Sequence, residues 1–314
     1  MLSAKGKLLW QPAHVIHENA LEELLDRLSS LRRHQQNGKR APHKPLLVLL
    51  ALGRLAETGS SAVPWSVAEK CLGELIAEFG PPSLTARRQS AAYPFTRLRS
   101  DGVWTLDRDV PMDSLGALDS SPITGRLDPR LEQMLKEPGA IEAAARVIVD
   151  SQFPMTVAPD VLLAVGLDPT RVFAAPAPGT REDRRRSSAW PAQILSAWDN
   201  QCAFCGYDGH LGSSPVGLEA AHVRWFNLDG PDDLDNGLAL YSLHHKLLDR
   251  GALGLDDEHR VVVSDRFTAR TESARRVYEL HHRQLRPRRG TLLPAQQHTA
   301  WHQHQVFQGQ PLTG

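Results

Sequence analysis

The segment LEAAHVRWFNLDGPDDLDNGLALYSLHHKLLD, residues 218–249, decides the fold of the C-terminal part of this chain. An apolar, strand-like piece ends at His222, the run Asp235-Asn236-Gly237-Leu238-Ala239-Leu240 follows, and His244 and His245 begin a predicted helix. The chain has 14 histidines, and most lone histidines are structural. One histidine, an asparagine and a double histidine inside one short window form a much more specific pattern, which indicates a functional site.

A cysteine pair precedes this segment in the run Cys202-Ala-Phe-Cys205-Gly206. Two residues between the cysteines let a turn aim both sulfurs at one tetrahedral zinc ion. The third cysteine, Cys71, is isolated in a helical pattern, so we expect a small core residue there.

Together these features resemble the HNH nuclease family in its McrA-type form, with E-A-A-H, D-N-G-L and H-H-K-L-x-D over about residues 195–255. The resemblance implies a hairpin packed on a helix around one metal ion, the ββα-metal fold, and cleavage of DNA. It implies that His222 is the general base, a task that suits a neutral imidazole. It further implies that Asn236 holds the loop and orients His222 or helps the metal, and that His245 binds the catalytic divalent ion, Mg²⁺ or Mn²⁺.

The chain departs from the family pattern at two positions. The family often has a metal-binding Asp before the base, where this chain has Ala221, and Glu219 is the nearest carboxylate. Members with the cysteine pair usually carry another Cys where this chain has Tyr241. The structural zinc set implied by the resemblance is therefore Cys202, Cys205 and His244 with an unidentified fourth ligand, and the alternative is that no zinc binds.

Composition sets the frame for the whole chain. Its 314 residues suggest two domains, and 41% hydrophobic residues suffice for ordinary cores. No apolar run approaches the ~20 residues that span a bilayer, and the first residues lack the pattern of a secretory signal, so we expect a cytoplasmic protein without a membrane partner. The 36 basic and 36 acidic residues cancel, but basic residues cluster at Arg32–Arg33, Lys39–Arg40, Arg87–Arg88, Arg97 and Arg99, Arg184–Arg186, and Arg283 through Arg289.

Apolar spacing of three and four predicts helices over 18–33, from Pro45, and over 65–79. The run YPFTRLRSDGVWTL predicts a hairpin that turns at 100–102, and further helices follow at 129–136, 140–150, 158–165 and 189–198. Residues 175–188 are rich in Pro, Gly, Ser and charge, which is typical of a linker. The tail after 286 has little periodicity, but its Trp301, Val306 and Phe307 indicate that it packs back on the protein.

The N-terminal half resembles the sulfur-binding domain of phosphorothioate-dependent McrA-type restriction endonucleases over about residues 15–165, on the runs RAPHKPLLVLLALGR and YPFTRLRSDGVW. That domain recognises DNA in which sulfur replaces a non-bridging phosphate oxygen. Sulfur is larger, softer and less hydrated than oxygen, so a reader of it needs an apolar cup with cations close by. By resemblance, His43, Lys44, Tyr93 and Pro94 form the sulfur pocket, and Arg87, Arg88, Arg97 and Arg99 hold the flanking backbone. The segment Ser120–Arg126 is a candidate for contacts with base edges.

We therefore expect an α+β chain with three parts: a helical and hairpin DNA sulfur-binding domain over 1–170, a linker over 171–188, and an HNH nuclease domain with a C-terminal tail over 189–314. The predicted function is that of a type IV-like restriction endonuclease, which binds phosphorothioate-modified double-stranded DNA and cuts it nearby, at loose positions if the linker is a flexible tether. Cutting both strands with one site per chain predicts a homodimer. The alternatives are an HNH nuclease directed to methylated or unmodified DNA, and a catalytically weakened DNA-binding sensor.

Overall fold

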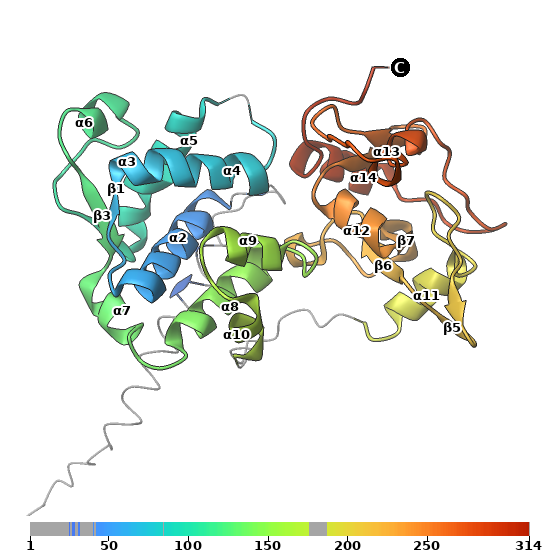
Figure 1. The fold of residues 1–314 in the computed structure, drawn as a ribbon, viewed down its shortest axis with the longest axis horizontal. Coiled ribbons are helices and arrows are strands. Elements are labelled where there is room, and N and C mark those ends of the chain that lie inside the picture. Colours follow the sequence, from blue (N-terminus) through green and yellow to red (C-terminus); the bar gives the residue numbers. More distant parts are fainter. Residues whose placement is uncertain are drawn as a thin grey trace, which may run out of the picture.

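The computed structural model describes residues 42–83, 85–175 and 187–313, together with Leu25, Arg27, Leu28, Leu31 and Arg40. Figure 1 shows two units, the first in blue to green and the second in yellow to red. Each has its own apolar core, one running from Leu25 to Val172 and the other from Trp190 to Leu285. Helices and small antiparallel sheets make up both units, which confirms the predicted α+β class.

The central helix of the first unit is α2 (His43–Thr58). It is apolar almost all round and therefore buried, as the sequence predicts. It ends at Gly59, whose φ of 73° is left-handed and whose N–H donates to the Leu55 oxygen. At Gly53 an added Cβ would lie 1.8 Å from the Val165 oxygen, so glycine lets α2 approach the neighbouring backbone.

The other helices of the first unit surround α2. The predicted helix over 65–79 is present as α3 (Trp65–Val67), a π-helical turn (Ala68–Leu72) and α4 (Gly73–Phe79) in succession. The elements that follow are α6 (Leu115–Asp119), α7 (Pro129–Met134), α8 (Ala140–Gln152), α9 (Ala158–Ala164) and α10 (Pro169–Ala174). Of the predicted helix over 18–33, only four residues lie within the described part, and Leu25, Leu28 and Leu31 are buried there.

The predicted hairpin over residues 93–106 is wrong. Its first half lies in α5 (Arg87–Arg97) and a 3₁₀ turn (Leu98–Asp101). Its second half, β2 (Trp104–Leu106), pairs antiparallel with β3 (Thr124–Leu127), which also pairs with β1 (Val63–Pro64). The helix forms despite an internal proline because Ala91, Ala92, Phe95 and Leu98 recur at helical spacing and bury one face.

The second unit is built on a strand pair followed directly by a helix. β6 (Leu218–His222) and β7 (Gly237–Tyr241) are antiparallel, with His222 opposite Gly237, and α12 (Ser242–Asp249) begins where β7 ends. The loop between the strands contains two 3₁₀ turns, Phe226–Leu228 and Leu234–Asn236. This is the hairpin-and-helix arrangement that the sequence predicts.

Further elements enclose this centre. They are α11 (Trp190–Ala197), β4 (His210–Leu211), β5 (Ser214–Pro215), β8 (Leu253–Leu255), β9 (Val261–Val263), α13 (Glu272–Arg275), a 3₁₀ turn (Tyr278–Leu280) and α14 (Gln296–Gln305). The tail packs back as predicted: Val306 and Phe307 are buried, and His302 of α14 donates its Nε2–H to the Leu248 oxygen at 2.9 Å. Across the described ranges, no helix is long and apolar enough to cross a bilayer.

Candidate active site

The end of β6, the following loop and one face of α12 line a common cavity of about 140 Å³. Its walls include His222, Asp232, His245 and Asp249. The last two stand four residues apart on α12 and therefore share a face of that helix. The fold thus brings two of the three predicted catalytic residues, His222 and His245, to one cavity and adds two carboxylates to them.

Two side chains position the ring of His222, one through a ring nitrogen and one by stacking. Its Nε2 lies 2.8 Å from Oδ1 of Asp232, and its ring stacks on Trp190 with centroids 3.8 Å apart and planes within 9°. The other carboxylate oxygen of Asp232 accepts the N–H of Ser187 at 2.6 Å. A carboxylate can only accept, so Asp232 favours the proton on Nε2 and leaves Nδ1 as the basic nitrogen.

Asn236 holds the loop between the strands. Fully buried, it accepts the Arg224 N–H at 2.8 Å and donates to the oxygens of Arg224 (3.0 Å) and Pro231 (2.9 Å). At Gly230 an added Cβ would lie 1.8 Å from the Arg224 oxygen, so this tight loop requires glycine. Of the roles expected for Asn236, holding the loop fits these contacts.

His245 lies between two carboxylates. Its Nδ1 is 2.7 Å from Oε2 of Glu219, and its Nε2 is 3.2 Å from Oδ2 of Asp249. Burial disfavours the charged ring, but Asp249 and Glu219 outweigh burial and raise the pKa of His245 to about 9. Nε2 of His245 and Oδ2 of Asp249 are close enough to share a divalent cation in place of the proton, while Glu219 contacts the opposite ring nitrogen.

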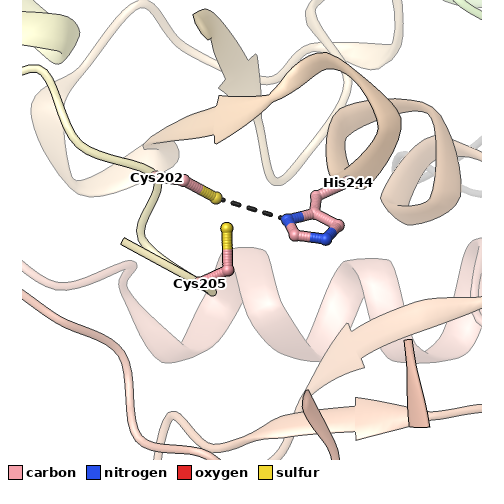
Figure 2. Close-up of side chains that lie close together, drawn as sticks. All are labelled: Cys202, Cys205 and His244. Carbon is pink, nitrogen blue, oxygen red and sulfur yellow. Dashed lines mark hydrogen bonds between the residues drawn. The ribbon is translucent and has the colours of Figure 1, made fainter. Parts of the chain in front are cut away.

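The cysteine pair and His244 meet as the sequence predicts. Figure 2 shows both sulfurs pointing toward the His244 ring, with Cys202 Sγ 3.3 Å from Nδ1. Within the described ranges this is the one group of three or more His, Cys, Asp or Glu residues whose ligand atoms all lie within 4.8 Å of one another. Hydrogen bonds with the Cys205 thiol and with His244 hold the pKa of Cys202 well below its usual range. The contact between the two cysteines raises the pKa of Cys205.

Tyr241 stands beside this group, where the family usually has another cysteine. Its ring packs edge-on against His244, with centroids 5.5 Å apart, and tilts against Tyr207 at 4.8 Å. Two thiolates and an imidazole are ligands that suit a tetrahedral zinc ion. Because residue 241 is a tyrosine, it does not supply a sulfur as the fourth ligand.

The residues predicted to contact DNA sulfur lie on two helices of the first unit. His43 and Lys44 form the first turn of α2, and Tyr93 and Pro94 lie in the middle of α5. Lys44 Nζ is 2.5 Å from Asp101 Oδ2, and burial together with Arg40 lowers the pKa of His43. Pro94 is buried and Tyr93 half-buried, so an apolar surface and a cation come from adjoining elements.

The arginines predicted to hold the DNA backbone are on the surface, and most are paired with carboxylates. Arg88 contacts Glu69 and Asp119, Arg97 contacts Asp113 while its guanidinium lies 4.9 Å from the Tyr93 ring, and Arg99 contacts Asp109. Arg87 is exposed. Arg126, at the end of the segment considered for base contacts, pairs with the buried Glu132. Exposed ion pairs such as those of Arg88 and Arg97 are individually weak.

The sequence analysis missed three residues of the cavity. Asp249 could have been predicted, because it follows His245 by four residues on a predicted helix and so shares its face. No sequence pattern would have predicted Asp232 or Trp190. Asp232 is one of three aspartates in the run PDDLD, and Trp190 reaches His222 only through the packing of α11 against β6 and β7.

Comparison with protein families agrees with this architecture. Residues 21–170 match the model of the ScoMcrA-like DNA sulfur-binding domain, and residues 202–256 match an HNH endonuclease model. The chain therefore joins a DNA sulfur-binding domain to an HNH endonuclease domain, as the two resemblances in its sequence indicate.

Solved structures show more distant likeness. The sulfur-binding domain of ScoMcrA complexed with phosphorothioated DNA is 20% identical, with a TM-score of 0.39 over 45% of this chain and 97% of that chain. The corresponding domain of SprMcrA, also in complex with phosphorothioated DNA, is 21% identical, with a TM-score of 0.38 over 48% and 96%. The phosphorothioation-dependent restriction endonuclease ScoMcrA itself is 18% identical, with a TM-score of 0.38 over 55% and only 33%. No curated protein matches the chain.

Proposed function

We propose that this protein is a restriction endonuclease that binds phosphorothioate-modified double-stranded DNA through its first domain and hydrolyses phosphodiester bonds nearby through its second. The observation that carries the proposal is the cavity where His222, paired with Asp232, faces the His245–Asp249 pair, in a chain that also has a sulfur-binding domain. A histidine base beside a carboxylate–imidazole cation site is suited to phosphodiester hydrolysis.

In the proposed reaction, His222 accepts a proton from the water that attacks the phosphorus, and the bond to the leaving oxygen breaks. Asp232 accepts the Nε2–H of His222, which keeps the ring in one tautomer and stabilises the imidazolium that forms. Asp249 and His245 would hold a divalent cation such as Mg²⁺ or Mn²⁺, with Glu219 at the other edge of the His245 ring. When bound, that cation neutralises charge on the scissile phosphate. Because residue 221 is an alanine rather than an aspartate, Asp249 is the buried carboxylate that would bind the cation.

Recognition of the modification follows from the first turn of α2 and the middle of α5. The half-buried Tyr93 ring offers apolar surface to a soft, weakly hydrated sulfur next to the buried Pro94, while Lys44 and His43 offer donors to the rest of the phosphate. Arg88, Arg97 and Arg99 then hold neighbouring phosphates in place of their present carboxylates, and the exposed Arg87 holds a further one. These contacts supply the preference for modified DNA that the catalytic cavity lacks.

The test is cleavage of one plasmid in sulfur-modified, methylated and plain form, with Mg²⁺ or Mn²⁺. We expect cutting of the modified plasmid and loss of at least 10²-fold in rate for His222→Ala. The control is His304→Ala, which removes an exposed histidine of α14. Preference for the methylated or plain plasmid would favour a nuclease with another signal, and equal inactivity of wild type and His222→Ala would favour a DNA-binding sensor.

A binding measurement separates recognition from cleavage. Tyr93→Ala should reduce the affinity ratio between modified and unmodified duplexes of one sequence. Tyr207→Ala in the second domain should leave that ratio unchanged. Equal affinity of the wild-type protein for both duplexes would rule out sulfur recognition.

The nuclease site holds one set of catalytic residues, and cutting both strands requires two. We therefore propose that the active form contains two copies of the chain. Sedimentation of the protein with and without a modified duplex gives its stoichiometry, and a strictly monomeric complex that still makes double-strand breaks would contradict this.

A further inference from the structure

The first domain contacts the nuclease domain at the catalytic cavity. Thr156, in the loop between α8 and α9, donates its hydroxyl proton to the Asp249 carboxylate. Pro154 and Met155 of the same loop line the cavity beside His222 and His245. One wall of the catalytic cavity therefore belongs to the sulfur-binding domain.

Acidic residues of the first domain meet basic residues of α12. Lys246 Nζ lies 2.9 Å from Asp160 Oδ1, and Arg250 Nη2 lies 2.6 Å from Glu78 Oε1, with its Nη1 3.9 Å from Asp160 Oδ2. Figure 1 shows α9, which carries Asp160, on the side of the first domain that faces α12. Each of these cations directly follows one of the proposed metal-binding residues, His245 and Asp249.

The domains also meet through hydrogen bonds to backbone oxygens and through a buried arginine. Asn227 of the nuclease domain donates to the backbone oxygens of Phe153 (2.6 Å) and Asp150 (3.2 Å). Arg40 is buried, donates to the Phe79 and Gln305 oxygens, and lies 4.2 Å from the Trp225 ring. These contacts place the two domains against each other in a defined arrangement.

The loop between α8 and α9 narrows access to His222 in this arrangement. Pro154, Met155 and Thr156 line the same cavity of about 140 Å³ as His222 and Asp249, so a duplex that approached these residues would meet this loop. A scissile phosphate at His245 and Asp249 would have its neighbours along α12, where Lys246 and Arg250 stand. Phosphates and the carboxylates of Asp160 and Glu78 would therefore compete for the same two cations.

We infer that the α12 face with Lys246 and Arg250 is the surface on which the nuclease domain binds the DNA backbone, and that the sulfur-binding domain occupies it in the DNA-free protein with Asp160 and Glu78 in the place of phosphates. This inference rests on the proposed nuclease function. It makes release of the sulfur-binding domain a requirement for cleavage. The half-exposed ion pairs suit such exchange, because pairs of this kind are weak individually and screened by salt.

Two double variants test the inference, because both remove the same ion pairs from opposite sides. Asp160→Asn with Glu78→Gln should cut unmodified DNA at least 5-fold faster than wild type, since the cations are released for phosphate. Lys246→Gln with Arg250→Gln should cut modified DNA at least 10-fold more slowly, while its binding of a short modified duplex through the first domain is retained. Glu57→Gln with Glu137→Gln is the control for charge alone, since both side chains are exposed away from α12.

Loss of cleavage in both double variants, or no change in either, would overturn the inference. Failure of the proposed function is recognised separately, because the wild-type protein would then not cut modified DNA in the same assay. Small-angle scattering gives a readout without cleavage: Asp160→Asn with Glu78→Gln, and wild type with modified duplex, should increase the separation of the domains. An unchanged separation in both samples would also overturn the inference.

Discussion

Asp232 is the residue whose replacement best tests how His222 is held. Asp232→Asn removes the charge that favours the imidazolium, so we expect turnover on modified DNA to fall by about 10²-fold with duplex affinity unchanged. The control is Asp233→Asn, which changes an exposed neighbour. Unchanged turnover of Asp232→Asn would mean that Asp232 only packs the loop.

The Cys202, Cys205 and His244 group predicts a structural metal. Purified protein should contain about one zinc per chain, and Cys202→Ser should lose it and lower the melting temperature of the nuclease domain. Cys71→Ser, which changes the lone cysteine of the first domain, should retain the zinc. Zinc content well below one per chain in the wild-type protein would rule the metal out and leave a hydrogen-bonded thiol–imidazole cluster.

At the residue scale, the site residues were predicted through the resemblance of their motif to HNH nucleases. His222 and His245 were predicted in this way, and the fold brings both to one cavity. The three backbone contacts of Asn236 could not be predicted in detail, since they depend on the shape of the loop. Asp232 reaches His222 across that same loop, and no spacing rule distinguishes it from Asp233 or Asp235.

At the scale of elements, the docking of α14 should depend on pH. Burial lowers the pKa of His302 to about 4, whereas an unfolded histidine titrates near 6.5, so the unfolded chain takes up the proton first. Stability should therefore fall as pH drops from about 6.5 to about 4, by roughly 3 kcal/mol in total. His302→Gln keeps a donor for the Leu248 oxygen and should flatten this dependence, which denaturant unfolding at several pH values measures. His304→Gln, at an exposed position of α14, should retain the full slope.

The elements themselves were predicted where apolar spacing and breakers agreed. Helix α2, with Pro45 near its start and Gly59 after its end, and helices α7 to α9 lie close to their predicted ranges. The run at α5 was predicted as a strand because Tyr93, Pro94 and a following turn suggested a hairpin. The segment is helical because a helix buries Ala91 and Phe95 together on one face against the core. Helix α14 was missed because its polar sequence has almost no periodicity, and its position depends on tertiary contacts such as those of His302 with Leu248 and of Gln305 with Arg40.

At the scale of the whole molecule, the balance of basic and acidic residues appears as ion pairs between them. The basic residues expected to bind DNA largely have acidic partners within the protein, within the first domain for Arg88 and Arg97 and between the domains for Lys246 and Arg250. Composition alone could not reveal this, because it counts charges without their neighbours. The prediction of loosely positioned cleavage assumed a flexible tether over 175–188, most of which lies outside the described residues.

Ser187 and Trp190 stand at the point where the described chain resumes, well before residue 202, where the match to the HNH model begins. Ser187 donates to Asp232 and Trp190 stacks on His222, while His302 near the other end supports Leu248. An exchangeable cleavage module must therefore include residues 187–313 rather than 202–256. A graft trimmed to the family motif would keep every motif residue and Asp232, but it would lose the Trp190 ring that stacks on His222 and the Ser187 N–H that binds Asp232.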